Sequence, residues 1–388
     1  MSEISYLVKK FGDFQVEWKT LGEVAKIYGG LIGKSKSDFE NGNTQYISYK
    51  NIFDNIEVKF DALNFVKVSA SENQHEVKYG DVLFTGSSET AEEAGMSSSV
   101  TTQYEGTVYL NSFSFGVRFN DDIQLIPEFS KYLFRSHFMR TEIEKTASGV
   151  TRFNISKYRF KKIQIPIPPL HVQAEIVRIL DKFTELTTEL TTELTTELTA
   201  RKKQYAYYRD KLLTFKEGEV EWKTLGEVAK IKHGKDWKKL NTGNVPVYGS
   251  GGIMGYVDIY SYDKPTVLIP RKGSITNIFY VDSPFWNVDT IYYTKIDIDQ
   301  ILPKFFYYYM TKTDLMKLDT GSGRPSLTQA ILNEIKIPIP PLTEQARIVA
   351  ILDKFDTLVN SISEGLPHEI ELRRQQYAYY RNLLLNFP

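Results

Sequence analysis

The chain has 388 residues, of which 41% are apolar and 25% are charged, a composition typical of globular proteins with room for two or more domains. Its 48 Lys and Arg residues equal its 48 Asp and Glu residues, so overall charge is only weak evidence about partners. The lack of cysteine excludes disulfides and thiolate metal sites. No apolar run approaches the roughly 18 residues of a membrane span, and the start does not resemble a secretory signal. We therefore expect a cytoplasmic protein.

The first predicted elements follow the segment VEWKTLGEVAKI at 16–27. Short β-rich runs between turn residues lie at 45–49, 82–84 and 112–117. A helix is expected after Pro127, where four residues keep helical spacing: Phe129, Tyr132, Leu133 and Phe138. The chain up to about Ile165 is therefore predicted to form a compact domain of mixed β and α structure.

A long amphipathic helix is expected after the block IPIPPL at 165–170, because Pro168 and Pro169 end the strand-like run before it. Apolar residues then keep three- and four-residue spacing for about 40 residues. They are Ile176, Ile179, Leu180, Phe183, Leu186, Leu190, Leu194, Tyr205, Tyr208 and Leu212. This length is typical of a coiled-coil strut rather than of a lone globular helix.

Inside this helix the four residues TELT occur at 184–187 and repeat without interruption to 199. Each unit adds about 6 Å of helix and turns the chain by roughly 40° beyond a full turn. The number of repeats would therefore set the distance between the parts of the protein at the two ends of this helix. The alternative is a low-complexity spacer that merely continues the helix.

Three segments described above or contained in the long helix occur a second time, and together they are called the repeated frame. VEWKTLGEVAKI recurs at 220–231, IPIPPL at 337–342, and QYAYYR of 204–209 at 376–381. The segment between them shares almost no sequence with the first insert, but it too has β-rich runs, at 245–248, 266–269 and 291–294, and a helix expected after Pro303. The residues GLP at 365–367 predict a break in the second long helix.

The predicted fold is α+β, with two domains of mixed β/α structure joined by two long helices. Two equivalent long helices in one chain are expected to pack antiparallel as a coiled coil, which gives the chain an internal pseudo-two-fold repeat. The expected parts are a first domain at 1–165, the first long helix at 166–217, a second domain at 218–337 and a second helical region at 338–388.

These duplicated blocks and the tandem TELT spacer resemble the DNA-specificity subunits of type I restriction–modification enzymes over the whole chain. The resemblance implies two target-recognition domains, each binding one half of a split, asymmetric site in double-stranded DNA. It implies that the helices separate these domains and help to recruit two methyltransferase subunits, which two motor-nuclease subunits join. Repeat number would set the unspecified gap in the DNA site. S-adenosylmethionine is expected on the methyltransferase partners, and this chain is expected to bind no cofactor.

Candidate DNA contacts are loop cations and small polar groups, because phosphates supply affinity whereas base edges supply specificity. In the first domain they are Lys34, Lys36, Ser87, Ser88, Arg152 and Asn154. In the second domain they are Lys235, Lys238, Ser250, Arg271, Lys272, Ser274, Arg324 and Ser326. Arg152 and Arg324 stand at the same distance from their Pro-Pro blocks. The alternative roles are solvated loops for the lysines and salt bridges to the adjacent helix for the two arginines.

The repeated YAYYR motifs suggest contacts of two kinds. Tyr205 and Tyr208 are spaced to pack in the helix seam. Residues on the other faces suit interface anchors for partner subunits: Tyr207, Arg209, Tyr379 and Arg381.

No catalytic constellation is found in the sequence. The Pro-Pro pairs lack the Asn or Asp and the aromatic residue of an adenine methyltransferase motif, and the five histidines show no metal-ligand spacing. The glycines around 249–255 lack the spacing and the following helix of a nucleotide cradle. We therefore expect a non-catalytic subunit. The alternative functions are a pseudo-symmetric coiled-coil adaptor that binds proteins or glycans and, less favoured, a standalone nuclease.

Overall fold

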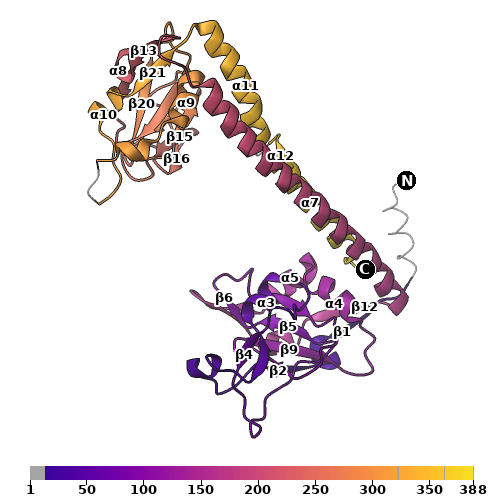
Figure 1. Ribbon diagram of the computed structural model, residues 1–388. Coiled ribbons are helices and arrows are strands. Elements are labelled where there is room, and N and C mark those ends of the chain that lie inside the picture. Colours follow the sequence, from indigo (N-terminus) through magenta and orange to yellow (C-terminus); the bar gives the residue numbers. More distant parts are fainter. Residues whose placement is uncertain (1–13, 321–322, 362, 388) are drawn as a thin grey trace. The chain divides into compact units, whose positions relative to one another are not determined.

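The computed structural model describes residues 14–320, 323–361 and 363–387 (Figure 1). The chain divides into two compact units. The first holds the chain up to Thr191 and again from Leu372, and the second holds Thr192–Glu371. The division falls inside the TELT repeats. None of the described helices combines the length and the apolar character needed to cross a membrane.

The first unit contains a four-stranded antiparallel sheet in the order β2-β9-β5-β7. Its strands are β2 (Ala25–Gly29), β9 (Ser114–Phe119), β5 (Val82–Thr85) and β7 (Ser97–Ser99). A second sheet has the order β4-β3-β8, from β4 (Asn64–Val66), β3 (Thr44–Ile47) and β8 (Val108–Leu110), with β3 and β8 parallel. A third, small sheet has the order β10-β11-β6, from β10 (Ala147–Ser148), β11 (Phe153–Ile155) and β6 (Ser87–Ser88).

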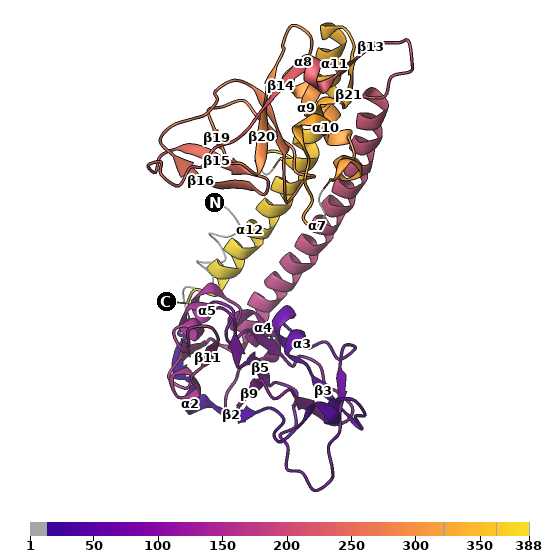
Figure 2. The same cartoon turned by 90° about the vertical axis from the view of Figure 1, so that its left-hand side faces the viewer.

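The second unit repeats the topology of the first two of these sheets with a different sequence. Its four-stranded sheet has the order β14-β20-β17-β18, from β14 (Ala229–Lys232), β20 (Ile291–Ile296), β17 (Thr266–Pro270) and β18 (Phe279–Val281). Its three-stranded sheet has the order β16-β15-β19, from β16 (Gly252–Val257), β15 (Val245–Gly249) and β19 (Trp286–Asn287), again with one parallel pair. Figure 2 shows this small sheet beside β20. The two inserts therefore share the topology of these two sheets, whereas their sequences predicted only domains of mixed β/α structure.

Short helices complete the two units. The first unit has α2 (Leu21–Val24), η1 (Lys36–Phe39), α3 (Tyr49–Asp54), α4 (Pro127–Leu133), α5 (His137–Glu144) and α6 (Lys157–Phe160). The second unit has α8 (Leu225–Val228), α9 (Pro303–Lys312), η2 (Leu315–Leu318) and α10 (Gln329–Asn333).

The predicted helices after Pro127 and Pro303 are confirmed as α4 and α9. Phe138 belongs to a separate helix, α5, because the Ser136 hydroxyl caps it by accepting a hydrogen bond from the Met139 amide. In the same way Ser48 caps α3, so Tyr49 begins a helix instead of ending the expected β run.

The repeated frame forms the same contacts in both units. β1 (Glu17–Thr20) pairs with β12 (Gln164–Ile167), and β13 (Glu221–Thr224) pairs with β21 (Lys336–Ile339) in the same antiparallel register. Behind each pair a fully buried glutamine, Gln173 or Gln345, satisfies three backbone groups. Gln173 accepts from Ile126 N and donates to the carbonyls of Gln124 and Pro168. Gln345 accepts from Leu302 N and donates to those of Gln300 and Pro340.

A buried tyrosine in each insert also bonds to the long helix that follows that insert. The Tyr132 hydroxyl donates to Asp181 at 2.6 Å, and Tyr308 donates to Asp353 at the same distance. Burial raises the pKa of both hydroxyls, so they remain donors. The companion cation differs: Asp181 pairs with Lys131, the residue before Tyr132, whereas Asp353 pairs with Lys304, four residues before Tyr308.

The long helix α7 (Leu170–Leu212) begins directly after the Pro-Pro block, as predicted. Its first turns enter the core of the first unit, where Ile176 and Leu180 are fully buried. The second copy is divided into α11 (Leu342–Asn360) and α12 (Leu366–Leu384), which confirms the expected break.

Helix pairing within each unit uses equivalent residues. In the first unit, Phe183 of α7 stacks on Tyr380 of α12 with ring centroids 5.3 Å apart. In the second unit, Phe355 of α11 stacks on Tyr208 of α7 at 5.5 Å, and Tyr205 lies at 6.3 Å. Tyr205 and Tyr208 therefore lie in the seam, as their spacing predicted, and the duplicated coiled-coil contact is confirmed.

Candidate nucleic-acid interface

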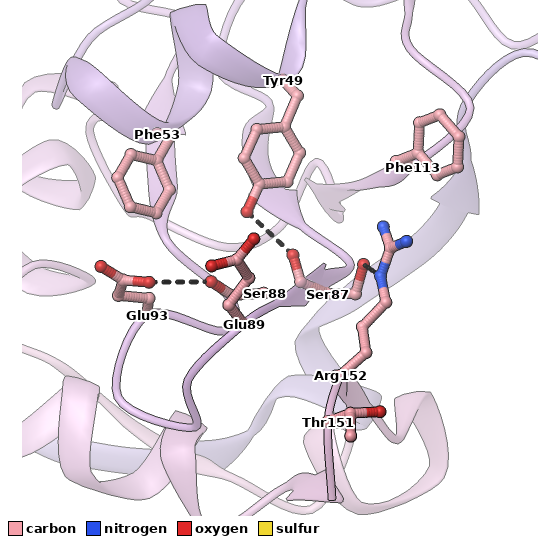
Figure 3. Close-up of a pocket in the computed structure, with 9 residues that line it drawn as sticks. All are labelled: Tyr49, Phe53, Ser87, Ser88, Glu89, Glu93, Phe113, Thr151 and Arg152. Atoms are coloured by element: carbon pink, nitrogen blue, oxygen red, sulfur yellow. Dashed lines mark hydrogen bonds between the residues drawn. The ribbon is translucent and has the colours of Figure 1, made fainter. Parts of the chain in front are cut away.

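A hollow of about 560 Å³ opens at one edge of the first unit (Figure 3). It is lined by Tyr49, Phe53, Ser87, Ser88, Glu89, Glu93, Phe113, Thr151 and Arg152. The small sheet builds its floor, because Ser87 and Ser88 of β6 pair with Asn154 and Phe153 of β11. This pairing brings the polar loop before β11 beside β6, although 65 residues separate Arg152 from Ser87.

Arg152 is fixed at its inner end and exposed at its outer end. Its Nε donates to the Ser87 hydroxyl at 3.0 Å, and its guanidinium lies 5.7 Å from the ring centroid of Phe113. Among the described residues no carboxylate lies within ion-pairing distance of this guanidinium. The salt bridge left open by the sequence is therefore not made in the described part of the chain. Arg152 is exposed, and its terminal nitrogens lie on the side of Phe113 (Figure 3).

The other predicted contacts of this unit take different positions. Ser87 is only 6% exposed, and its hydroxyl accepts the hydrogen bond from Arg152. The Ser88 hydroxyl donates to Glu93 at 3.1 Å. Asn154 is exposed, with its amide near the Arg152 carbonyl.

Lys34 does not fit its predicted role as a DNA contact. Its side chain is only 4% exposed, and its ammonium donates to the Lys67 carbonyl at 2.6 Å and pairs with Glu72. Hydrogen bonding from Lys34 is the leading cause that holds the pKa of Glu72 at about 2. This ammonium fastens two loops and is not available to a phosphate. Lys36, at the start of η1, is exposed.

The second unit carries different groups at matched positions. Lys272 forms a β-bridge with Ser326, where the first unit pairs Ser87 with Asn154. Lys272 is bound to Asp289 at 2.8 Å, and the Arg271 guanidinium lies 3.8 Å from the same carboxylate. Hydrogen bonding from Lys272 is the first cause that lowers the pKa of Asp289. The Arg–Lys pair is therefore held by one acid, whereas the Arg324 side chain is exposed.

The structure brings several other predicted residues of this unit together. The Ser250 carbonyl accepts from Asn277, which places the glycine loop beside the loop of Lys272 and the exposed Ser274. Lys235 and Lys238 are exposed, and the Lys235 backbone is bonded to Asn287 and to the Trp286 indole.

Two residues that sequence reasoning missed hold the walls of the first hollow. Arg135 is half-buried and donates to four backbone carbonyls, those of Ser97, Ile52, Phe53 and Asn55, at 2.6–3.2 Å. Arg140 donates to the carbonyls of Glu92, Ala94 and Gly95. Burial lowers the pKa of each guanidinium to about 10, so both remain charged at neutral pH. The available signal was the presence of two arginines in a segment, 134–143, that also carries the apolar residues Phe134, Phe138, Met139 and Ile143.

The YAYYR motifs expose their middle tyrosines. Tyr207 is 59% exposed and Tyr379 is 63% exposed. Arg381 differs from the prediction that it points away from the helix seam. It lies over the Tyr377 ring, its Nε is buried without a hydrogen-bond partner, and burial lowers its pKa. Arg209 is about one quarter exposed and contacts Asp210 and Tyr205.

Within the described ranges no three His, Cys, Asp or Glu residues gather in a way that could hold a metal ion. The groups that stand out chemically are instead arginines, lysines and small polar side chains at sheet edges. Such groups hydrogen-bond to phosphates and to base edges.

Comparison with known proteins identifies the architecture. The family model for the type I restriction modification DNA specificity domain matches twice, at residues 15–200 and 217–372. The specificity subunit of the EcoR124I/EcoR124II type I restriction enzyme of Escherichia coli is 34% identical over 100% of this chain and 98% of its own length. That of the EcoprrI enzyme of Escherichia coli is 33% identical over 94% of this chain and 93% of its own length.

Solved structures share the fold. A chain from a study of assembly and conformational transition in the type I restriction–modification system aligns with a TM-score of 0.69 at 17% identity, covering 96% of this chain and 97% of its own. The HsdS subunit of Thermoanaerobacter tengcongensis aligns with a TM-score of 0.56 at 19% identity, covering 95% of both chains. The two family matches and the full-length relatives agree with the duplicated frame, and the chain belongs to the type I restriction–modification DNA-specificity family.

Proposed function

We propose that this chain is the sequence-reading subunit of a type I restriction–modification complex, in which each recognition unit reads one half of a split DNA site. The main support is that two inserts of almost unrelated sequence have one topology inside one repeated frame. At matched edge positions they carry different groups, such as Ser87 and Lys272. A scaffold that keeps its fold while its edge chemistry changes suits a reader of two different half-sites.

The chemistry is proposed to reside on partner subunits. Two methyltransferase subunits would supply S-adenosylmethionine and methyl transfer, and two motor-nuclease subunits would supply translocation and cleavage. The exposed Tyr207 and Tyr379 are proposed anchors for these partners, because tyrosine is enriched in protein interfaces. This chain would then be non-catalytic.

The TELT repeats are proposed to act as a ruler between the two recognition units. All of them lie within α7, which is one continuous helix. Threonine hydroxyls donate back to the helix, as Thr191, Thr196 and Thr199 do to the carbonyls four residues earlier. Leu186 is 47% exposed. Leu190, Leu194 and Leu198 are half-buried, but none of the four repeat leucines belongs to the core of either unit. Units can therefore be added or removed without damage to those cores.

The proposed function predicts a methylation pattern that depends on this chain. When it is co-expressed with a methyltransferase subunit of its family, methylated positions mapped across the genome should share one split sequence, and this pattern should vanish without the chain. If the purified complex instead shows no salt-dependent, sequence-selective DNA binding, the adaptor function becomes the better explanation.

The Arg271→Ala variant is expected to weaken recognition of the second half-site by roughly tenfold and to leave the first unchanged. The guanidinium follows β17 at the edge of the second unit, lies 3.8 Å from the Asp289 carboxylate and donates to the Asp289 carbonyl. Binding of DNA mutated in one half at a time measures the effect. Arg347→Ala is the control, because Arg347 is an exposed arginine of α11 paired with Glu344. An equal loss on both halves would contradict the assignment.

A further inference from the structure

We infer that Arg152 reads a guanine in the first half of the DNA site and that the hollow beside it accepts the major-groove edge of that base pair. This inference rests on the proposed function and adds to it the identity of one base. It depends on an arginine that has no ion-pair partner among the described residues, on two carboxylates in the same hollow, and on a scaffold that fixes both.

The first step concerns the hydrogen-bond donors of Arg152. Its Nε is occupied by the Ser87 hydroxyl at 3.0 Å, and its guanidinium carbon lies 5.7 Å from the centroid of the Phe113 ring. The two terminal nitrogens carry only donors, form a planar fork and lie away from Ser87 on the side of Phe113 (Figure 3). Guanine offers two adjacent acceptors, O6 and N7, whereas adenine offers one acceptor beside an amino donor. A fork of donors therefore matches guanine and opposes adenine.

The second step concerns the carboxylates. Glu89 and Glu93 line the same hollow as Arg152, and Glu93 is held by the Ser88 hydroxyl at 3.1 Å. Among the described residues, neither carboxylate forms an ion pair with Arg152. Carboxylates repel a phosphate but accept hydrogen bonds from the exocyclic amino group of cytosine. The hollow thus suits a base edge, and cytosine opposite the guanine supplies the amino group.

The third step concerns rigidity, because an ordered site binds with less loss of side-chain entropy. The Tyr49 hydroxyl donates to the Ser87 carbonyl at 2.8 Å, which fixes the strand that carries the Arg152 anchor. Arg140 holds the turn between Glu92 and Gly95 on the carboxylate side. The walls of the hollow are therefore set before DNA arrives.

The second unit lacks this support for its matched arginine. Lys272 stands where the first unit has Ser87, and its ammonium is bound to Asp289. Arg324 consequently has no serine hydroxyl at that position to fix its Nε. The fixed pair of donors that matches guanine is therefore a property of the first unit. The matched variants Arg152→Gln and Arg324→Gln distinguish effects on the first half-site from effects on the second.

The test uses the assembled complex and DNA that carries its mapped site. Each guanine of the first half-site is replaced in turn by 7-deazaguanine, which lacks N7, or by inosine, which keeps N7 and O6. At one position the 7-deaza base should weaken binding at least fivefold, whereas inosine should bind like guanine. With Arg152→Gln, binding should be weak already and the 7-deaza base should cause no further loss.

Three outcomes decide the inference. If no guanine of the first half-site is sensitive to loss of N7, or if the 7-deaza loss persists in Arg152→Gln, the inference is wrong while the proposed function stands. If the native complex shows no sequence selectivity, the proposed function itself fails. Arg324→Gln should leave the first-half response intact. Ser87→Ala should reduce the discrimination between guanine and 7-deazaguanine without altering the salt dependence, because Ser87 positions the guanidinium and is itself buried.

Discussion

Deletion of one TELT unit, residues 192–195, should shorten the unspecified gap of the DNA site by one or two base pairs and leave both half-sites unchanged. Four helical residues span about 6 Å and leave a rotation of roughly 40°. DNA rises about 3.4 Å per base pair and turns by roughly 35°, so the length and rotation changes both correspond to one or two steps. Methylated positions mapped in cells that carry the deleted chain would measure the new gap.

The second helical copy offers a place to absorb this change. The residues equivalent to the repeats, at 356–371, contain the interruption between Asn360 and Leu366. A four-residue deletion also nearly preserves helical phase, so the aromatic contacts of Phe183 and Tyr208 keep their faces.

Two control variants separate length from composition. Leu194→Ala keeps the number of residues and should keep the gap. Deletion of a single residue rotates the following helix by about 100° and should disrupt recognition rather than adjust it. A gap that stays constant after the four-residue deletion, or half-sites with new bases, would refute the ruler.

The repeated frame was predictable because its physical signals are local. The Pro-Pro blocks end a strand and begin a helix, and the interruption at Gly365 follows from a glycine and a proline close together. The aromatic seam at Tyr205 and Tyr208 follows from helical spacing alone.

The matched sheets and the hollow were not predictable in this way. Their strands are two to six residues long, too short for periodicity to define pairing, and β6 meets β11 across 65 residues of chain. The sequence pointed to Arg152 through its distance from the Pro-Pro block, but the hydrogen bond from Arg152 to Ser87 depends on the tertiary structure. Lys34 shows the opposite case, since a lysine in a polar loop gave no sign of its burial with Glu72.

The Arg135→Met variant should loosen the first recognition unit and abolish reading of the first half-site while the second remains. The guanidinium donates to four carbonyls, three of them at the end of α3, which carries Tyr49 and Phe53 of the hollow. An unsatisfied buried acceptor costs about 1–3 kcal/mol, so we expect a loss of stability on the order of 4 kcal/mol for this unit, since relaxation and water recover part of the total.

Hydrogen exchange in the assembled complex would localise the effect. Protection should fall in α3 and in β7, which are the elements that Arg135 joins, and stay unchanged in β17 of the second unit. Arg178→Met makes the same change at a side chain that is 69% exposed and paired with Glu175, and it should alter stability by less than about 0.5 kcal/mol.

Arg135→Lys distinguishes charge from geometry. A lysine ammonium keeps the positive charge but has three donors on one nitrogen, so it cannot span carbonyls that lie on both α3 and β7. We expect it to recover only a minor part of the lost protection. Full recovery would mean that charge alone holds the hollow, and unchanged protection in Arg135→Met would mean that the α3 wall is held by its apolar contacts instead.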